Sequence, residues 1–132
     1  MKVFTGSTIR QQLQEDELKA LVADFRRYKI FGQLPQMFGR DSPYNHYNTP
    51  RLLLLEGVQH IHLNDGENPW PLYRAQHNKT SDKAHLVYCQ GAINPDYYLF
   101  IAILSPDAHK QAKDFGVMQK LGTAAEKSRL KF

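Results

Sequence analysis

The sequence predicts an α+β fold in one domain over residues 1–132: a small antiparallel β-sheet, N-terminal helices packed on it and a C-terminal helix. Three observations predict this. Apolar residues recur at helical spacing within 15–31, and two strand-like segments, 85–90 and 97–104, follow one another across a short turn. A serine, a proline and an acidic residue at 105–107, which are typical of a helix start, come directly after the second of these segments. Consecutive strands with connections too short for a helical crossover pair antiparallel.

The N-terminal elements follow in order. Residues 1–5 predict a short strand, and a brief helix capped by Ser7 or Thr8 runs to Leu13. A longer helix covers 15–31, where acidic side chains at the start and basic ones at the end complement the helix dipole. A glycine comes directly after it and provides a helix stop.

The middle of the chain is predicted to be mostly loop. Residues 33–57 contain turn signals at 39–43, and residues 52–55 are either a short strand or one buried helical turn. The pattern of 58–63 is typical of a strand, and a second loop runs from 64 to 81.

Two strands and a helix complete the chain. The segment 97–104 is apolar on both faces, so it should lie inside the sheet, and a hairpin at 91–96 joins it to 85–90. Ser105 is expected to cap the last helix, because a proline and an acidic residue follow it. The helical pattern then continues to about residue 129.

Composition excludes several classes of protein. No apolar run approaches the roughly 20 residues that span a bilayer, and one cysteine, Cys89, supports neither an internal disulfide nor a cysteine-based zinc site. We expect no signal peptide, no membrane association and a reducing, cytoplasmic location. The net charge is +4, and both ends are basic, which indicates a polyanionic partner.

His60 and His62 are the most informative candidate site residues. Alternate strand residues share a face, so both imidazoles point one way while Ile61 and Leu63 point into a core. Two adjacent histidines can bind a metal, divide acid and base roles, or contact phosphate. The alternative is a surface pair on a half-exposed strand. A metal site would need further ligands, and Glu67 is one candidate.

Two further groups suit RNA. His109 and Lys110 follow the expected helix start, where backbone amides attract anions. The loop before residue 85 has three cations interleaved with aromatic side chains, a composition that suits phosphate contacts and base stacking on single-stranded RNA. These cations are Arg74, Lys79 and Lys83.

Several segments together resemble the YafO family, the mRNA interferase toxins of type II toxin–antitoxin modules. The resemblance runs along nearly the whole chain and is most specific over Ala84–Gly91. The other segments that carry it are Phe38–Asp41, His60–Leu63, Ile101–Leu104, Pro106 and His109–Lys110.

The resemblance implies a ribosome-dependent endoribonuclease that cuts translated mRNA, with the large ribosomal subunit and mRNA as partners. It also implies a cognate antitoxin, and contact with operator DNA only through that antitoxin. Wider relatives, the RelE/ParE-like toxins, have helices packed on a small antiparallel sheet. Two alternatives stay open: a His-x-His metal enzyme, and a non-catalytic inhibitor that binds the ribosome or gyrase.

The residues themselves suggest chemistry that needs neither metal nor cofactor. The RNA 2′-hydroxyl attacks the neighbouring phosphate, and the products are a 2′,3′-cyclic phosphate and a 5′-hydroxyl. His60 or His62 would be the base, and His109 the acid or a phosphate clamp. His85 is a third candidate proton carrier. The backbone would be held by Lys110, Arg74, Lys79 and Lys83.

Overall fold

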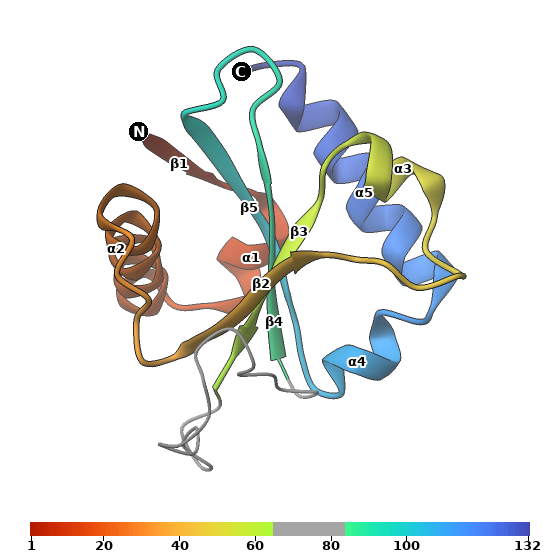
Figure 1. Cartoon of the computed structure of the whole chain (residues 1–132), viewed down its shortest axis with the longest axis horizontal. Coiled ribbons are helices and arrows are strands. Elements are labelled where there is room, and N and C mark those ends of the chain that lie inside the picture. The colour runs from red at the N-terminus through yellow and green to blue at the C-terminus, as the bar shows by residue number, and fades with distance from the viewer. Residues whose placement is uncertain (65–83) are drawn as a thin grey trace.

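A five-stranded mixed sheet forms the centre of the protein (Figure 1). The computed structural model describes residues 1–64 and 84–132. Within them the strands lie in the order β1-β5-β4-β3-β2. Their bounds are β1 Lys2–Thr5, β2 Phe38–Pro43, β3 Gln59–Leu63, β4 Ala84–Gln90 and β5 Tyr97–Leu104.

The sheet is not wholly antiparallel as expected, because β1 pairs parallel with β5. The other three neighbouring pairs are antiparallel. A short connection determines the pairing direction only of strands that follow one another in the sequence. The strand β1 pairs with β5, far along the chain, so no short connection determines its direction. The strand β5 lies between β1 and β4, so the prediction of an interior position is confirmed.

Helices lie on both sides of the sheet (Figure 1). One face packs against α1 and α2, and the other against α3, α4 and α5. Their bounds are α1 Ser7–Gln12, α2 Glu15–Phe31, α3 Arg51–Leu55, α4 Ala108–Gln111 and α5 Phe115–Arg129. None of these helices is long and apolar enough to cross a membrane.

The helix α2 has the bounds that its sequence pattern predicts. A capping box of Gln14 and Glu17 begins it, and Gly32 ends it in the left-handed conformation with φ 68°. Phe25 is fully buried, and its ring meets Tyr88 and Phe100 edge-on at centroid distances of 5.0 and 4.9 Å. These aromatic contacts attach α2 to the middle of the sheet.

For residues 52–55, where the sequence allows either a short strand or a helical turn, the structure has the helical turn, within α3. Two sequence predictions differ from the structure. Residues 38–43 are the edge strand β2 rather than turns. The caps expected at Ser7 or Thr8 and at Ser105 are absent: Gly6 precedes α1, and α4 begins only at Ala108. Asp107, with φ 53°, adopts the left-handed conformation, so no helix can pass through it.

The C-terminus is fastened to the β4–β5 hairpin. The Phe132 ring stacks on Phe4 at 4.3 Å, and its carbonyl accepts a hydrogen bond from the Asn94 amide at 2.9 Å. Gly91 lies beneath this contact, where a Cβ atom would come within 2.1 Å of the Phe132 oxygen. Only glycine allows the two backbone segments to approach so closely.

We therefore expect Gly91→Ala to lower the free energy of unfolding by about 1–3 kcal/mol, the usual cost of overpacking. Chemical denaturation measures this. Gly116→Ala is the control, because its Cβ would meet only the Asp114 side chain, at 3.3 Å, at the start of α5. Equal effects of the two substitutions would contradict the close approach at Gly91.

Candidate functional site: a histidine cavity

Three histidines meet on the face of the sheet that α3, α4 and α5 cover in part. Ile61 and Leu63 are buried in the core on the α2 side, so His60 and His62 point the opposite way, as the strand pattern predicts. The β3–β4 pairing places His85 directly opposite His62. The three rings lie 4.5 to 4.9 Å apart between centroids.

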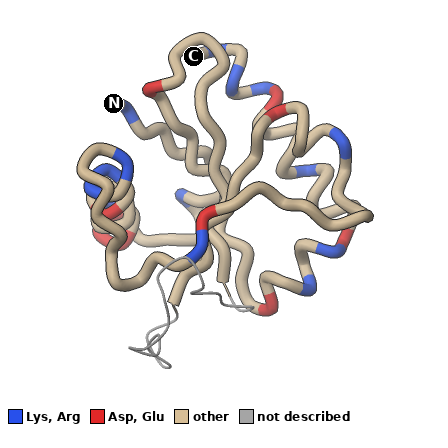
Figure 2. The backbone as a smooth tube through the Cα atoms, in the orientation of Figure 1, with Lys and Arg blue, Asp and Glu red and all other residues tan. Residues whose placement is uncertain are grey.

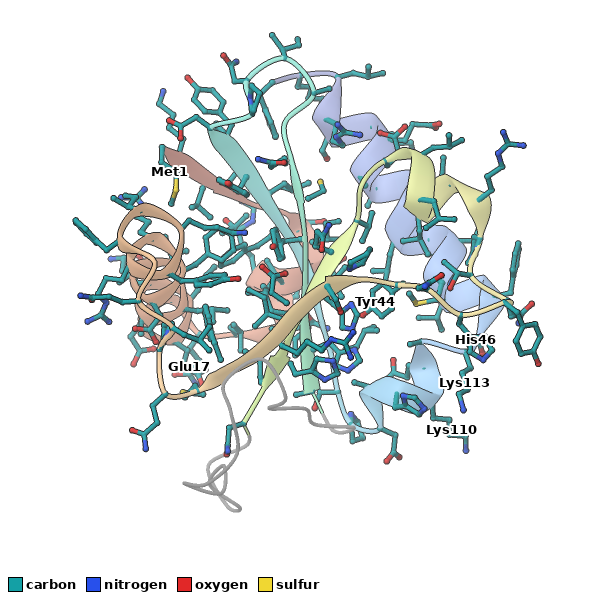
Figure 3. The ribbon with its side chains drawn as sticks, viewed as in Figure 1. Met1, Glu17, Tyr44, His46, Lys110 and Lys113 are labelled. Atoms are coloured by element: carbon teal, nitrogen blue, oxygen red, sulfur yellow. The ribbon has the colours of Figure 1, made fainter. Side chains whose placement is uncertain are left out.

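Tyr44, which follows β2, holds two of these histidines (Figure 3). Its ring stacks on His60 at 3.9 Å with an interplanar angle of 9°. Its hydroxyl lies 3.1 Å from Nδ1 of His85, within hydrogen-bond distance. Burial raises the pKa of Tyr44, so the phenol stays protonated and neutral.

The three histidines differ in their access to solvent. His60 and His85 are only 7% and 2% exposed, while His62 is half-buried. His60 is therefore not a surface side chain. The pKa of His60 is lowered to about 3, mainly by burial and also by the neighbouring His85 and His62, while a hydrogen bond to the Ser42 backbone acts in the opposite direction. His60 is neutral at physiological pH.

A cavity of about 380 Å³ opens beside this cluster. Two cationic side chains, Arg40 and Lys113, line it, and among the described residues no carboxylate does. The cavity therefore suits an anion next to groups that can move protons. The lining residues are Arg40, Ser42, Pro43, Tyr44, Asn45, His46, His60, His62, His85, His109, Ala112 and Lys113.

The four histidines named from the sequence thus line one cavity. His109 comes from α4, a helix of four residues, and its side chain is exposed. Lys110 is exposed on the same helix but does not line the cavity (Figure 3). The three predicted RNA-binding cations of the loop, Arg74, Lys79 and Lys83, lie outside the described residues.

Sequence reasoning named only the histidines of β3, β4 and α4 among the lining residues, and four of those it missed matter most for the site: Arg40, Ser42, Tyr44 and Lys113. Arg40 and Ser42 share one face of β2, but the segment was expected to be turns, so no face was assigned to it. Tyr44 lies in a segment without periodicity. Lys113 follows α4 and lies four residues after His109, a spacing that would place both on one face of a helix, and both line the cavity. Figure 3 shows Lys113 beyond the end of α4.

The cluster also has the composition of a metal site. One ring nitrogen from each of His60, His62 and His85 lies within 4.8 Å of the others. The third ligand that a His-x-His site needs is therefore His85 from the paired strand. Glu67, the residue considered from the sequence, lies outside the described residues.

A larger cavity of about 600 Å³ lies at α1 and α2, lined in part by Arg10, Leu18 and Lys19. Among its described lining residues there is no histidine or cysteine. It offers no group that titrates near neutral pH, so the smaller histidine cavity is the better candidate for chemistry.

Comparison with known proteins agrees with the resemblance. A family model described as "Toxin YafO, type II toxin-antitoxin system" matches residues 26–130. The chain is 48% identical to the mRNA interferase toxin YafO of Escherichia coli (strain K12), with all 132 residues and the whole of that protein covered. No solved structure matches. The chain therefore belongs to the YafO family of type II toxin–antitoxin toxins.

Proposed function

We propose that this chain is an endoribonuclease that cuts mRNA during translation, using proton transfer by histidines of the cavity and no metal. The relative that is 48% identical over the full length is named an mRNA interferase toxin. The observation that carries the proposal is the cavity itself, which combines His62 and His109 with Arg40 and Lys113.

RNA contains its own nucleophile, so the protein needs to supply only a base, an acid and positive charge. The base takes the proton of the 2′-hydroxyl as the 2′-oxygen bonds to phosphorus. The bond from phosphorus to the 5′-oxygen breaks, and the acid protonates that oxygen. The products are a 2′,3′-cyclic phosphate and a 5′-hydroxyl. Each proton transfer is worth about 10²–10⁴-fold in rate.

His62 is the best candidate for the base. It is half-buried and lines the cavity, so a ribose can reach it, whereas His60 and His85 are almost fully covered. A base acts best with a pKa near the working pH, and the pKa of His60, near 3, is far below it. His60 and His85 then position His62 through their ring contacts.

His109 is the proposed acid or phosphate clamp. It lines the cavity from α4, while His62 lines it from β3. Arg40 and Lys113 supply positive charge to the pentacoordinate phosphorane as negative charge builds up on it. Lys110 would hold the RNA backbone further along the same surface. Roles for Arg74, Lys79 and Lys83 stay predictions.

The partners of the proposed enzyme are a cognate antitoxin, the large ribosomal subunit and mRNA, with operator DNA contacted through the antitoxin. Basic positions occur along α4 and α5 with few acidic ones between them (Figure 2). Such a surface suits an acidic antitoxin segment or the RNA of the ribosome. We also propose a RelE/ParE-like fold and a cytoplasmic location.

Ribosome dependence is the test of this function. We expect the purified chain to cut mRNA in a reconstituted translation system and to leave the same RNA intact without ribosomes. Mapping of the new 5′ ends measures both reactions. A mutant mRNA that lacks its start codon is the control, because it stays untranslated in the complete system.

Three outcomes would contradict the proposal. Equal cutting of naked and translated RNA would show that cleavage does not depend on the ribosome. Stalled translation without new RNA ends would indicate a non-catalytic inhibitor. Loss of plasmid supercoiling with intact mRNA would move the target to gyrase.

A further inference from the structure

We propose that His60, His62 and His85 bind one divalent transition-metal ion of the zinc class, and that metal binding there excludes RNA cleavage. The second half of this inference rests on the proposed function, because it requires His62 to be the proton carrier. The first half does not, since it depends only on the arrangement of three imidazoles.

The geometry supports a three-histidine site. The ligand nitrogens lie within 4.8 Å of one another, and tetrahedral zinc with bonds near 2.0–2.1 Å separates its ligand nitrogens by about 3.3 Å. The rings would therefore have to turn slightly toward one another when a metal ion binds. Two adjacent, hydrogen-bonded strands carry all three residues, with His62 opposite His85, so the backbone already holds the ligands in register.

The contacts around the three histidines also support a metal site. Metal-binding histidines use one ring nitrogen for the metal and the other for a hydrogen bond that fixes the ring. His85 has such a partner at Nδ1, the Tyr44 hydroxyl at 3.1 Å. Tyr44 also stacks on His60, and Nδ1 of His60 is buried without a hydrogen-bond partner among the described residues. A metal ion would give that nitrogen a partner.

The fourth coordination position would face the cavity. All three ligands line this cavity, and His62 is the one among them that is partly exposed to solvent. Three neutral imidazoles add no negative charge, and Arg40 and Lys113 make the cavity positive. The positive charge of these side chains opposes the binding of a metal ion, so we expect the metal to bind reversibly. Nitrogen ligands favour zinc over magnesium, so we expect the site to select zinc.

Exclusion follows from the chemistry of imidazole. A neutral ring has one basic lone pair, which can hold a metal ion or accept a proton, but not both. When His62 ligates zinc, it can no longer take the proton of the 2′-hydroxyl. Zinc should therefore inhibit cleavage at the same concentration at which it fills the site.

Binding is measured on the purified full chain without RNA. We expect one zinc per chain after equilibrium dialysis, and an absorption spectrum of tetrahedral cobalt when Co²⁺ replaces it. His62→Gln should weaken zinc binding by about 100-fold or more, since even the loss of an outer partner costs about 10–100-fold. His85→Gln should do the same, and its circular dichroism shows whether it is folded.

His46→Gln is the matched control, because it removes an imidazole that lines the same cavity but does not belong to the cluster. It should bind zinc as the natural chain does. Absence of zinc binding by the natural chain, or equal affinity of the natural chain and His62→Gln, would overturn the site.

The activity measurement tests the exclusion separately. Zinc should lower the rate of mRNA cleavage in step with site occupancy, and a chelator should restore it fully. Cleavage that is unchanged or accelerated by bound zinc would overturn the exclusion. If the chain cuts no RNA under any condition, the proposed function fails, while stoichiometric zinc binding that His62→Gln abolishes still supports the site.

Discussion

His62→Gln is expected to slow mRNA cleavage on translating ribosomes by about 10²-fold or more, the usual effect of losing a general base. Glutamine has a similar size and can form hydrogen bonds, but it cannot accept a proton near neutral pH. His62 is half-buried at the cavity, so the free energy of unfolding should change by less than about 1 kcal/mol. The measurements are the single-turnover rate and thermal unfolding of the same sample.

The double variant His60→Gln with His62→Gln should be no slower than His62→Gln alone once the folded fraction is taken into account. His60 is buried and stacked on Tyr44, so its replacement should cost mainly stability. His46→Gln is the activity control, since it removes an imidazole to which no proton transfer is assigned.

Two results would contradict the assignment of His62. If the double variant still cuts at nearly the natural rate, the acid–base pair lies elsewhere, and His85 with His109 becomes the leading pair. If stability falls while activity per folded molecule stays, the cluster is structural. In the metal-free mechanism a chelator does not lower the activity, whereas a metal enzyme would lose its activity.

The orientation of His60 and His62 could be predicted because a strand has a period of two. The apolar Ile61 and Leu63 between and after them indicated which side was the core, and both are buried. The presence of His85 in the same cluster depends instead on the register between β3 and β4. The 20 residues between these strands do not determine a register, so the sequence alone left His85 only as a further candidate.

The strand β2 could not be predicted because its segment has the composition of a turn. Glycine, serine and proline occur within six residues, and an edge strand tolerates them since one side of its backbone needs no partner strand. A register shift between Phe38 and Asp41 further disguises the alternation. Without β2, Arg40 and Tyr44 could not be placed beside the histidines.

The Asp41 carboxylate links β2 to α2 and β4 by hydrogen bonds. Tyr88 donates a hydrogen bond to its carboxylate at 2.7 Å, and Tyr28 donates another at 2.7 Å. Burial is the larger cause that raises the pKa of both tyrosines, and Asp41 raises it further, so both hydroxyls remain donors. The Lys29 ammonium lies 3.3 Å from the same carboxylate.

We expect Asp41→Ala to lower the free energy of unfolding by about 3 kcal/mol, because it leaves two hydroxyls and an ammonium group without their acceptor. This loss of stability lies at the low end of what breaking a buried ion pair usually costs. The reason is that the Lys29 and Asp41 side chains are still 23% and 13% exposed. Domains of this size have a total stability of only about 5–15 kcal/mol. The midpoint of thermal unfolding should therefore fall by roughly 10 °C.

Lys19→Gln is the matched control for this prediction. Its ion pair with Glu15 spans a similar 3.2 Å, but the two side chains are 75% and 85% exposed. Water already solvates both charges, so breaking the pair should change the free energy of unfolding by no more than about 0.5 kcal/mol. Calorimetry on the two variants separates the effects of burial and of charge. If they lose equal stability, Asp41 acts only as a surface charge, and β2 must be held to the sheet by its pairing with β3 alone.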